Sequence, residues 1–161
     1  MKKSTTKMVK ELRLFWKNYV IQSFLATLTM FILLLLLSIE HAVIIASIGA
    51  TAFIVFAMPK SVTAKPRSVI GGHFVGFLSG SLCALIPHSS FLCSIFVYSF
   101  AVGLSIFVMV VTDTEHPPAS GTALGFTITG FDLNAAVGLI TSVVILSLVH
   151  HFFNPYLRDL V

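Results

Sequence analysis

Long runs of apolar residues alternate with short polar segments along this 161-residue chain. The runs that contain no Asp, Glu, Lys or Arg cover residues 19–38, 41–58, 68–87, 91–112 and 133–153. A helix needs roughly 20 apolar residues to cross a bilayer core about 30 Å thick. The pattern therefore predicts five full-length membrane-spanning helices. Apolar and polar residues do not alternate within the runs, as they do in the strands of a membrane β-barrel.

A sixth uncharged segment, residues 117–131, is shorter and more polar than the others. As a helix it would extend only about 22 Å, and it carries the hydroxyl residues Ser120, Thr122, Thr127 and Thr129. We expect a half-helix or a short broken helix, which either crosses the membrane or re-enters it. The predicted fold class is an all-α integral membrane protein with a bundle of about six segments, five full-length and one short.

The basic residues fall at three places, and their positions predict the topology. Of the ten Lys and Arg residues, six precede residue 19, three lie between residues 60 and 67, and the last is Arg158. Six passes would place all of them on one side, which the positive-inside rule makes cytoplasmic. A re-entrant segment at 117–131 would instead put the tail outside.

This topology divides the chain into three parts, with both termini in the cytoplasm. Residues 1–18 form a basic cytoplasmic N-terminal segment, residues 19–153 a transmembrane domain of the type described below, and residues 154–161 a short cytoplasmic tail. We expect the protein to reside in a bacterial cytoplasmic (inner) membrane.

The composition excludes an ordinary soluble domain. Hydrophobic residues make up 57% of the chain and charged residues 10%, whereas a soluble domain carries about 25% charged residues. The net charge of +4 therefore does not indicate nucleic-acid binding, and the basic N-terminal segment is interpreted as a topology anchor that also attracts anionic lipid headgroups. The expected partner is the lipid bilayer, and no nucleic acid, metal or organic cofactor is indicated.

Two stretches of the sequence resemble each other. Residues 40–53 and 115–126 each begin with Glu-His and continue with Ala, Ser, Gly and Thr. Repeated short segments in two halves of a membrane protein are typical of an inverted 3+3 repeat, with a binding site between the halves. The alternative is a chance match, because small residues are common at helix–helix contacts in membranes.

The second stretch belongs to a longer motif that resembles a known family. Residues 112–124 read Thr-Asp-Thr-Glu-His-Pro-Pro-Ala-Ser-Gly-Thr-Ala-Leu and carry the His-Pro-Pro-Ala signature of the HPP family of integral membrane proteins. Residues 46–52 and 64–73 are similar to the family's other characteristic block, although Lys65 stands where Gln is frequent. The resemblance extends from about residue 20 to 153.

Some members of the HPP family are described as nitrite transporters. The resemblance therefore implies a membrane transporter or channel for a small inorganic anion, with nitrite as the leading candidate. The alternative is a non-transporting oligomeric membrane scaffold or accessory subunit. A homo-oligomer is compatible with either function.

Two helix starts are candidate anion sites. A helix N-terminus has unpaired N–H groups and about half a positive charge, which suits an anion. We expect two such ends to converge in the middle of the membrane. The expected substrate-binding residues are Ser47, Gly49, Thr51, His116, Pro118, Ser120, Gly121 and Thr122. Alternatively, Pro118 simply begins a helix, and the hydroxyls bond to carbonyls of their own helices.

Charged and titratable residues near the cytoplasmic face form a second candidate group. The expected cytoplasmic gate or vestibule consists of Lys65, Arg67, His73, Asp113 and Glu115. The charged members either form ion pairs between two loops or attract anions. Because its ordinary pKa is near 6.5, three roles are open for His116: it gates access, relays a proton or only caps the short helix.

Three glycines, Gly72, Gly76 and Gly80, are spaced by four residues and form a smooth ridge. Such a ridge permits close helix packing, either within one chain or across a dimer. The chain shows no zinc-protease motif, nucleophile elbow or phosphate-binding loop. The sequence therefore does not indicate an enzyme.

Overall fold

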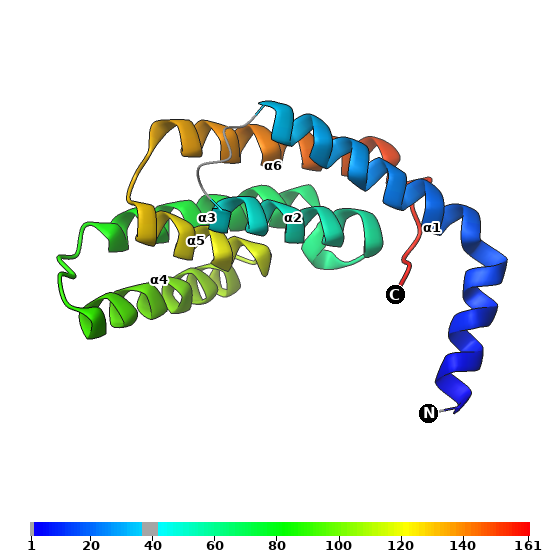
Figure 1. Ribbon diagram of the computed structural model, residues 1–161, viewed down its shortest axis with the longest axis horizontal. Helices are drawn as coiled ribbons and strands as arrows, with labels where there is room; N and C mark the ends of the chain where they lie inside the picture. The colour runs from blue at the N-terminus through cyan, green and yellow to red at the C-terminus, as the bar shows by residue number, and fades with distance from the viewer. Residues whose placement is uncertain (1, 37–41) are drawn as a thin grey trace.

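The computed structural model describes residues 2–36 and 42–161, and within these ranges the chain is helical, with no strand. The elements are α1 (Lys2–Leu36), α2 (Ala42–Ala57), the short 3₁₀ helix η1 (Val62–Ala64), α3 (Pro66–Ala84), α4 (Phe91–Val111), α5 (Pro118–Thr129) and α6 (Leu133–Phe153). The helices lie roughly side by side, and successive helices run in opposite directions (Figure 1). The all-helical prediction is confirmed for the described residues.

The helix ends follow from local sequence. Ser90 and Asp132 are N-caps, whose side chains accept hydrogen bonds from the N–H groups of Cys93 and Ala135. Pro66 and Pro118 begin α3 and α5, because a proline at the first helical position sacrifices no intrahelical hydrogen bond.

The helix lengths largely agree with the predicted runs. Helix α6 covers residues 133–153 as predicted, and α5, with 12 residues, is the short helix expected within 117–131. Helix α1 extends far beyond its apolar run, to Lys2, and bends at Phe15, whose φ of −122° and ψ of 19° are not helical. The pair Glu40-His41, which opens the first predicted repeat, lies outside the described residues.

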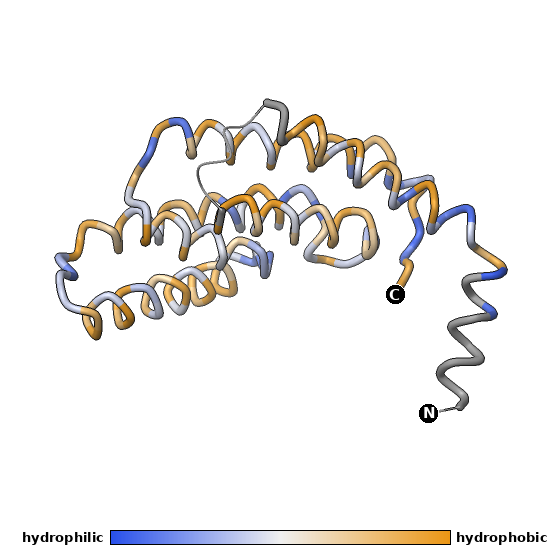
Figure 2. Tube along the Cα trace, viewed as in Figure 1, coloured by the Kyte–Doolittle hydropathy of each residue, from blue (hydrophilic) through white to orange (hydrophobic). Residues whose placement is uncertain are grey.

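Large apolar side chains face outward along the helices. Phe24 of α1, Phe74 of α3 and Phe107 of α4 are 63%, 60% and 66% exposed. Such surfaces are unusual for a water-soluble protein and are suited to lipid. Among the described helices, α4 and α6 are long and apolar enough to cross a membrane, and most of α2 is a shorter apolar helix. Figure 2 shows apolar residues along the helices and hydrophilic ones concentrated at the loops, near the bend of α1 and in the C-terminal tail.

Polar side chains occupy much of the interior. The buried polar residues that the structure describes are Gln22, Thr29, Ser47, Thr51, Ser68, His73, Ser79, Ser105, His116, Thr122, Thr127, Ser142, Ser147 and His150. Buried polar groups are costly unless they are hydrogen-bonded. The stability of the bundle therefore depends on the hydrogen-bond partners of these side chains.

The glycine ridge of α3 packs against α5 within the same chain. A Cβ atom added to Gly72, Gly76 or Gly80 would fall less than 3.0 Å from His116, Ala119 or Ala123, respectively. Glycine is therefore required at all three positions to let α3 and α5 approach. The open question of whether the ridge serves the monomer or a dimer is resolved in favour of packing within the chain.

The C-terminal tail folds back onto the start of the bundle. The buried Gln22 side chain donates from Nε2 to the carbonyls of Phe56 and Arg158, and its Oε1 accepts from the Arg158 N–H, 3.2 Å away. The Leu160 N–H donates to Ala57 O over 2.9 Å. Residues 154–161 are thus part of the packed structure.

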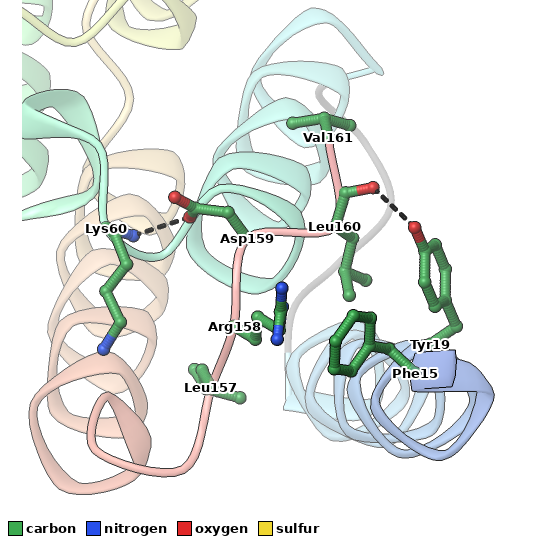
Figure 3. Close-up of a pocket in the computed structure, with 8 residues that line it drawn as sticks. All are labelled: Phe15, Tyr19, Lys60, Leu157, Arg158, Asp159, Leu160 and Val161. Atoms are coloured by element: carbon green, nitrogen blue, oxygen red, sulfur yellow. Dashed lines mark hydrogen bonds between the residues drawn. The ribbon is translucent and has the colours of Figure 1, made fainter. Parts of the chain in front are cut away.

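Figure 3 shows the pocket formed where the tail meets α1. Tyr19 donates its hydroxyl to Leu160 O over 3.0 Å, and the Arg158 guanidinium lies 3.5 Å from the centre of the Phe15 ring. The Lys60 N–H donates to Asp159 Oδ1. The loop after α2, the tail and the bend of α1 therefore lie at the same end of the bundle.

Candidate functional site

Five buried side chains from three helices and one loop form a connected polar cluster. They are Ser47 and Thr51 of α2, His73 of α3, His116 just before α5, and Thr122 of α5, none of them more than 5% exposed. We call these five residues the histidine–hydroxyl cluster. Its components come from distant parts of the chain, so only the fold brings them together.

Thr51 is the centre of this cluster. Its Oγ1 atom lies 2.8 Å from His73 Nε2, 2.9 Å from His116 Nε2 and 3.0 Å from the carbonyl oxygen of Ser47. A hydroxyl has one proton to donate and two lone pairs to accept. Thr51 Oγ1 thus has as many contacts as a hydroxyl group can make hydrogen bonds.

The two imidazole rings meet at Thr51 from different directions. Their ring centres are 5.0 Å apart, and the ring planes are inclined by 56°. On its other side, His73 Nδ1 lies 2.8 Å from Thr122 Oγ1, whereas His116 Nδ1 lies 2.8 Å from the carbonyl oxygen of Thr63. Because a carbonyl only accepts, His116 Nδ1 carries a proton.

Ser47 connects the cluster to the beginning of α5. Its hydroxyl donates to Pro118 O and lies 2.9 Å from Thr122 Oγ1. Gly121 packs directly on Ser47, since a Cβ added to Gly121 would lie 3.3 Å from Ser47 Cβ. Small residues on both helices therefore allow α2 and α5 to approach closely enough for the hydroxyls to bond.

A cavity of about 440 Å³ opens beside the cluster, between α4 and α5. Its walls include His116 and Ser120, together with Glu115 and Pro117 of the preceding loop. Apolar residues of α4, Ile106, Met109 and Val110, complete the lining. His116 borders this cavity, although its side chain is fully buried.

The expected convergence of two helix N-termini is wrong. Helices α2 and α5 lie side by side and antiparallel, with Gly121 against Ser47 and Gly125 against Ile44. The start of α5 therefore lies beside the middle of α2, and the start of α2 lies toward the far end of α5. Steric fit between the small residues of the two faces favours this side-by-side arrangement.

The N–H groups at the start of α5 are also occupied. The Ala119 N–H donates to His116 O over 2.9 Å, and the Ser120 N–H donates to Pro117 O over 3.1 Å. These two groups are the ones that an anion at the helix end would need. The groups in this region that could bind a ligand are thus the polar side chains of the cluster and not the backbone N–H groups of the helix start.

Of the predicted substrate-binding residues, Ser47, Thr51, His116 and Thr122 lie in the cluster itself. Pro118 and Gly121 border it through Ser47, and Ser120 lines the adjacent cavity. Gly49 is different, because a Cβ added there would meet no atom within 4 Å. It therefore faces away from this site.

The predicted gate residues separate into different places. Arg67 Nη1 lies 3.2 Å from Asp113 Oδ2, and Arg67 also donates to Thr112 O. Lys65 precedes α3 on the surface, and Glu115 lines the cavity. His73, expected at the cytoplasmic gate, instead lies inside the cluster.

Two contributors were missed by the sequence interpretation. Thr63 holds His116 through a backbone carbonyl, which no side-chain pattern reveals. Gln22 joins α1, α2 and the tail. The available signal for Gln22 was its occurrence as the sole amide side chain within the first apolar run.

A family model matches the sequence over nearly its full length, and two curated proteins match part of it. The family model "HPP, transmembrane region" matches residues 8–158. One transmembrane protein of Dictyostelium discoideum is 40% identical over 91 residues, which cover 55% of this chain and 31% of the relative. Another from the same organism is 31% identical over 106 residues, covering 65% of this chain and 34% of the relative.

This chain spans about a third of the length of these two curated relatives. No solved structure matches it.

Proposed function

The chain belongs to the HPP transmembrane family, and on this premise we propose that it is a membrane transporter or channel for a small inorganic anion, with nitrite as the leading substrate. The observation that carries the proposal is the histidine–hydroxyl cluster, buried between α2, α3 and α5 beside a cavity. Burying a titratable residue inside a membrane bundle costs free energy, and such residues usually have a functional role.

The chemistry of the cluster suits a monovalent anion. Hydroxyl and imidazole N–H groups are hydrogen-bond donors, and the hydrogen bonds of the five side chains involve only one another and backbone carbonyls of the described residues. Hydrogen-bond donors favour a negatively charged ligand, and Glu115, although it lines the cavity, makes none of the hydrogen bonds described for the cluster. A site without a fixed Lys or Arg would also release the anion readily.

The cavity provides a place for the anion to approach this cluster. Ser120 and His116 are the polar groups on its wall nearest to α5, and the α4 side is apolar. An apolar wall with few polar groups is typical of small-ligand sites. We propose that the anion enters here and exchanges partners with His116.

The placement of the loops supports a six-pass topology with both termini cytoplasmic. The loop after α2, the loop before α5 and the tail share one end of the bundle, as the Lys60–Asn154 and Arg67–Asp113 contacts indicate. The short helices α2 and α5 hold corresponding positions in the two halves and run antiparallel. This arrangement favours an inverted 3+3 repeat. The location that we propose is a bacterial inner membrane.

Reconstitution into liposomes tests the proposed function. The purified chain should produce saturable nitrite uptake that protein-free liposomes lack, with nitrate, formate and chloride as competitors. Ser120→Ala should lower uptake, because Ser120 lines the cavity, whereas Ser99→Ala, on the exposed face of α4, should not. Folded protein that carries none of these anions would refute the proposal.

A non-transporting, oligomeric scaffold is the second candidate. The cluster side chains bond to one another, and a satisfied polar network can also serve to fix a unique packing. Under this hypothesis, disrupting the cluster would change stability or oligomeric state, and no wild-type flux would exist to be lost.

A further inference from the structure

The histidine–hydroxyl cluster contains more hydrogen-bonding contacts than protons. Seven contacts join its five side chains to one another and to the carbonyls of Ser47, Thr63 and Pro118. Three hydroxyls and two neutral imidazoles supply only five protons. Each hydrogen bond needs one proton, so two of the seven contacts have no proton available to them.

The first shortage falls on Thr51. His116 Nδ1 donates to Thr63 O, so the Nε2 atom of a neutral His116 has no proton. Both this nitrogen and Ser47 O then require the single proton of Thr51. A proton added to His116 Nε2 removes this conflict, because Thr51 can then accept from His116 and donate to Ser47 O.

The second shortage falls on Thr122. The Ser47 hydroxyl donates to Pro118 O, so Ser47 Oγ can only accept from Thr122. If His73 donates from Nε2 to Thr51, its bare Nδ1 also requires the Thr122 proton. A proton added to His73 Nδ1 satisfies both contacts. The opposite tautomer of His73 moves the same shortage to Thr51.

Other charged and titratable groups stand apart from the imidazole contacts. Helices α2 and α5 contain no Asp, Glu, Lys, Arg or His. The groups on the remaining elements around the cluster are Lys65, Arg67, Cys83, Cys93, Tyr98, Asp113, Glu115, His150 and His151. None of them makes a hydrogen bond described for either imidazole, and Glu115 is the one that shares the cavity with His116.

Because Glu115 makes no hydrogen bond described for either imidazole, a further negative charge next to His116 would stabilise a protonated cluster. Two imidazolium rings with centres 5.0 Å apart would repel each other, so occupation by a single added proton is favoured over two. An anion in the cavity next to His116 would neutralise that proton. The geometry thus places the binding site of the added proton next to the cavity that would hold the anion.

We propose that the histidine–hydroxyl cluster is a proton-binding site, at which His73 and His116 share one proton taken from water when an anion binds. This inference rests on the proposed function, and it implies that the protein transports an anion together with a proton. The proton resides on His116 Nε2 or His73 Nδ1 and leaves when the anion leaves. No net charge then crosses the membrane.

Proton uptake on anion binding tests this inference. The full chain in detergent is mixed with sodium nitrite in weakly buffered solution at about pH 7.5, where free imidazole is mostly neutral, and pH is followed with an indicator dye. We expect uptake of about one proton per bound nitrite. His73→Gln/His116→Gln, which keeps amide donors and acceptors but cannot titrate there, should take up none.

His151→Gln is the matched control, because His151 is exposed at the end of α6 and should retain wild-type uptake. Nitrogen-15 spectra of histidine-labelled wild type provide a second readout that needs no folded variant. They should show the His73 and His116 signals shifting toward imidazolium when nitrite is added.

Three results would be decisive against one or both proposals. Nitrite binding by calorimetry without proton uptake overturns this inference and leaves anion transport standing. Nitrogen-15 signals of both histidines that stay neutral with nitrite bound do the same. Folded protein that neither binds nor carries nitrite overturns the proposed function and this inference with it.

Discussion

Thr51 Oγ1 lies 2.9 Å from His116 Nε2, although the two residues are 65 positions apart in the sequence. The same oxygen lies 2.8 Å from His73 Nε2. One hydroxyl therefore holds two imidazoles from different parts of the chain in fixed positions. Several expected properties of the protein depend on this contact and on the helix packing that permits it.

Removal of the Thr51 hydroxyl should destabilise the protein. Thr51→Val keeps the β-branched shape but leaves both Nε2 atoms without their partner, and an unsatisfied buried polar group costs about 1–3 kcal/mol. SDS-induced unfolding measures the change. In the control Thr27→Val, the lost hydroxyl is exposed and bonds only to Ser23 O, so the free energy of unfolding should change by at most about 0.5 kcal/mol. Equal effects would show that Thr51 is not a special position.

A methyl group on the α3 ridge should separate α3 from α5. In Gly76→Ala the new Cβ would clash with the backbone of Ala119, and overpacking typically costs about 1–3 kcal/mol. Gly103→Ala on α4 is the matched control, because a Cβ there meets nothing within 4 Å. It should leave stability unchanged or raise it by about 0.5–1 kcal/mol. If thermal unfolding in detergent ranks the two variants the other way, the described α3–α5 contact is incorrect.

Replacement of Gln22 should release the C-terminal tail. Gln22→Leu keeps an apolar side chain of similar length but removes the bonds to the backbone of Arg158 and Phe56. Hydrogen exchange of the Arg158 and Leu160 amides should then accelerate roughly tenfold or more, because a lost constraint of about 1.4 kcal/mol opens the segment tenfold more often. Ser23→Ala, on the exposed side of α1, should exchange like wild type, and unchanged exchange in Gln22→Leu would contradict the docking of the tail.

Asp113 should tolerate Asn better than Val. Its φ of 55° lies in the left-handed region, which Asn adopts readily and β-branched residues avoid. Its ion pair with Arg67 is exposed, so Asp113→Asn should cost less than about 1 kcal/mol. Asp113→Val should cost about 1–2 kcal/mol more through backbone strain. Equal stability of the two variants in SDS-induced unfolding would argue against this backbone conformation.

Single cysteines should report the proposed topology. In a Cys83→Ala/Cys93→Ala background, Lys65→Cys lies in the loop after α2 and Ser89→Cys in the loop after α3, at opposite ends of the bundle (Figure 1). A membrane-impermeant thiol reagent added to intact cells should label Cys at 89 and not at 65. Labelling of both from outside, or of 65 alone, would contradict six passes with cytoplasmic termini.

Much of the fold could be predicted from the sequence because membrane helices are specified by local composition. The apolar run at 133–153 coincides with α6, and the shortness of α5 followed from the reduced length of its uncharged segment. Burial of apolar surface in lipid depends on each segment by itself. The bend at Phe15 and the helical continuation of α1 into the basic segment carried no comparable signal.

Only part of the candidate site could be predicted from the sequence. The small and hydroxyl-bearing residues around Ser47 and Thr122 were identified, but their expected meeting at helix ends was wrong. His73 was assigned to the wrong place, since its position along α3 does not reveal that it faces Thr51 and Thr122. A lone histidine in an apolar run shows that a partner is needed, but not which one.

The amino-acid order alone determined that this chain is a helical membrane protein of the HPP family, with its charges gathered in a few short segments, because each of these properties resides in contiguous residues. The tertiary structure decided that Ser47, Thr51, His73, His116 and Thr122 form one buried network, because their contacts depend on how α2, α3 and α5 align. That alignment is set by glycine-permitted contact between helix faces. The fit of one surface to another is a property of the assembled bundle, and no single segment contains it.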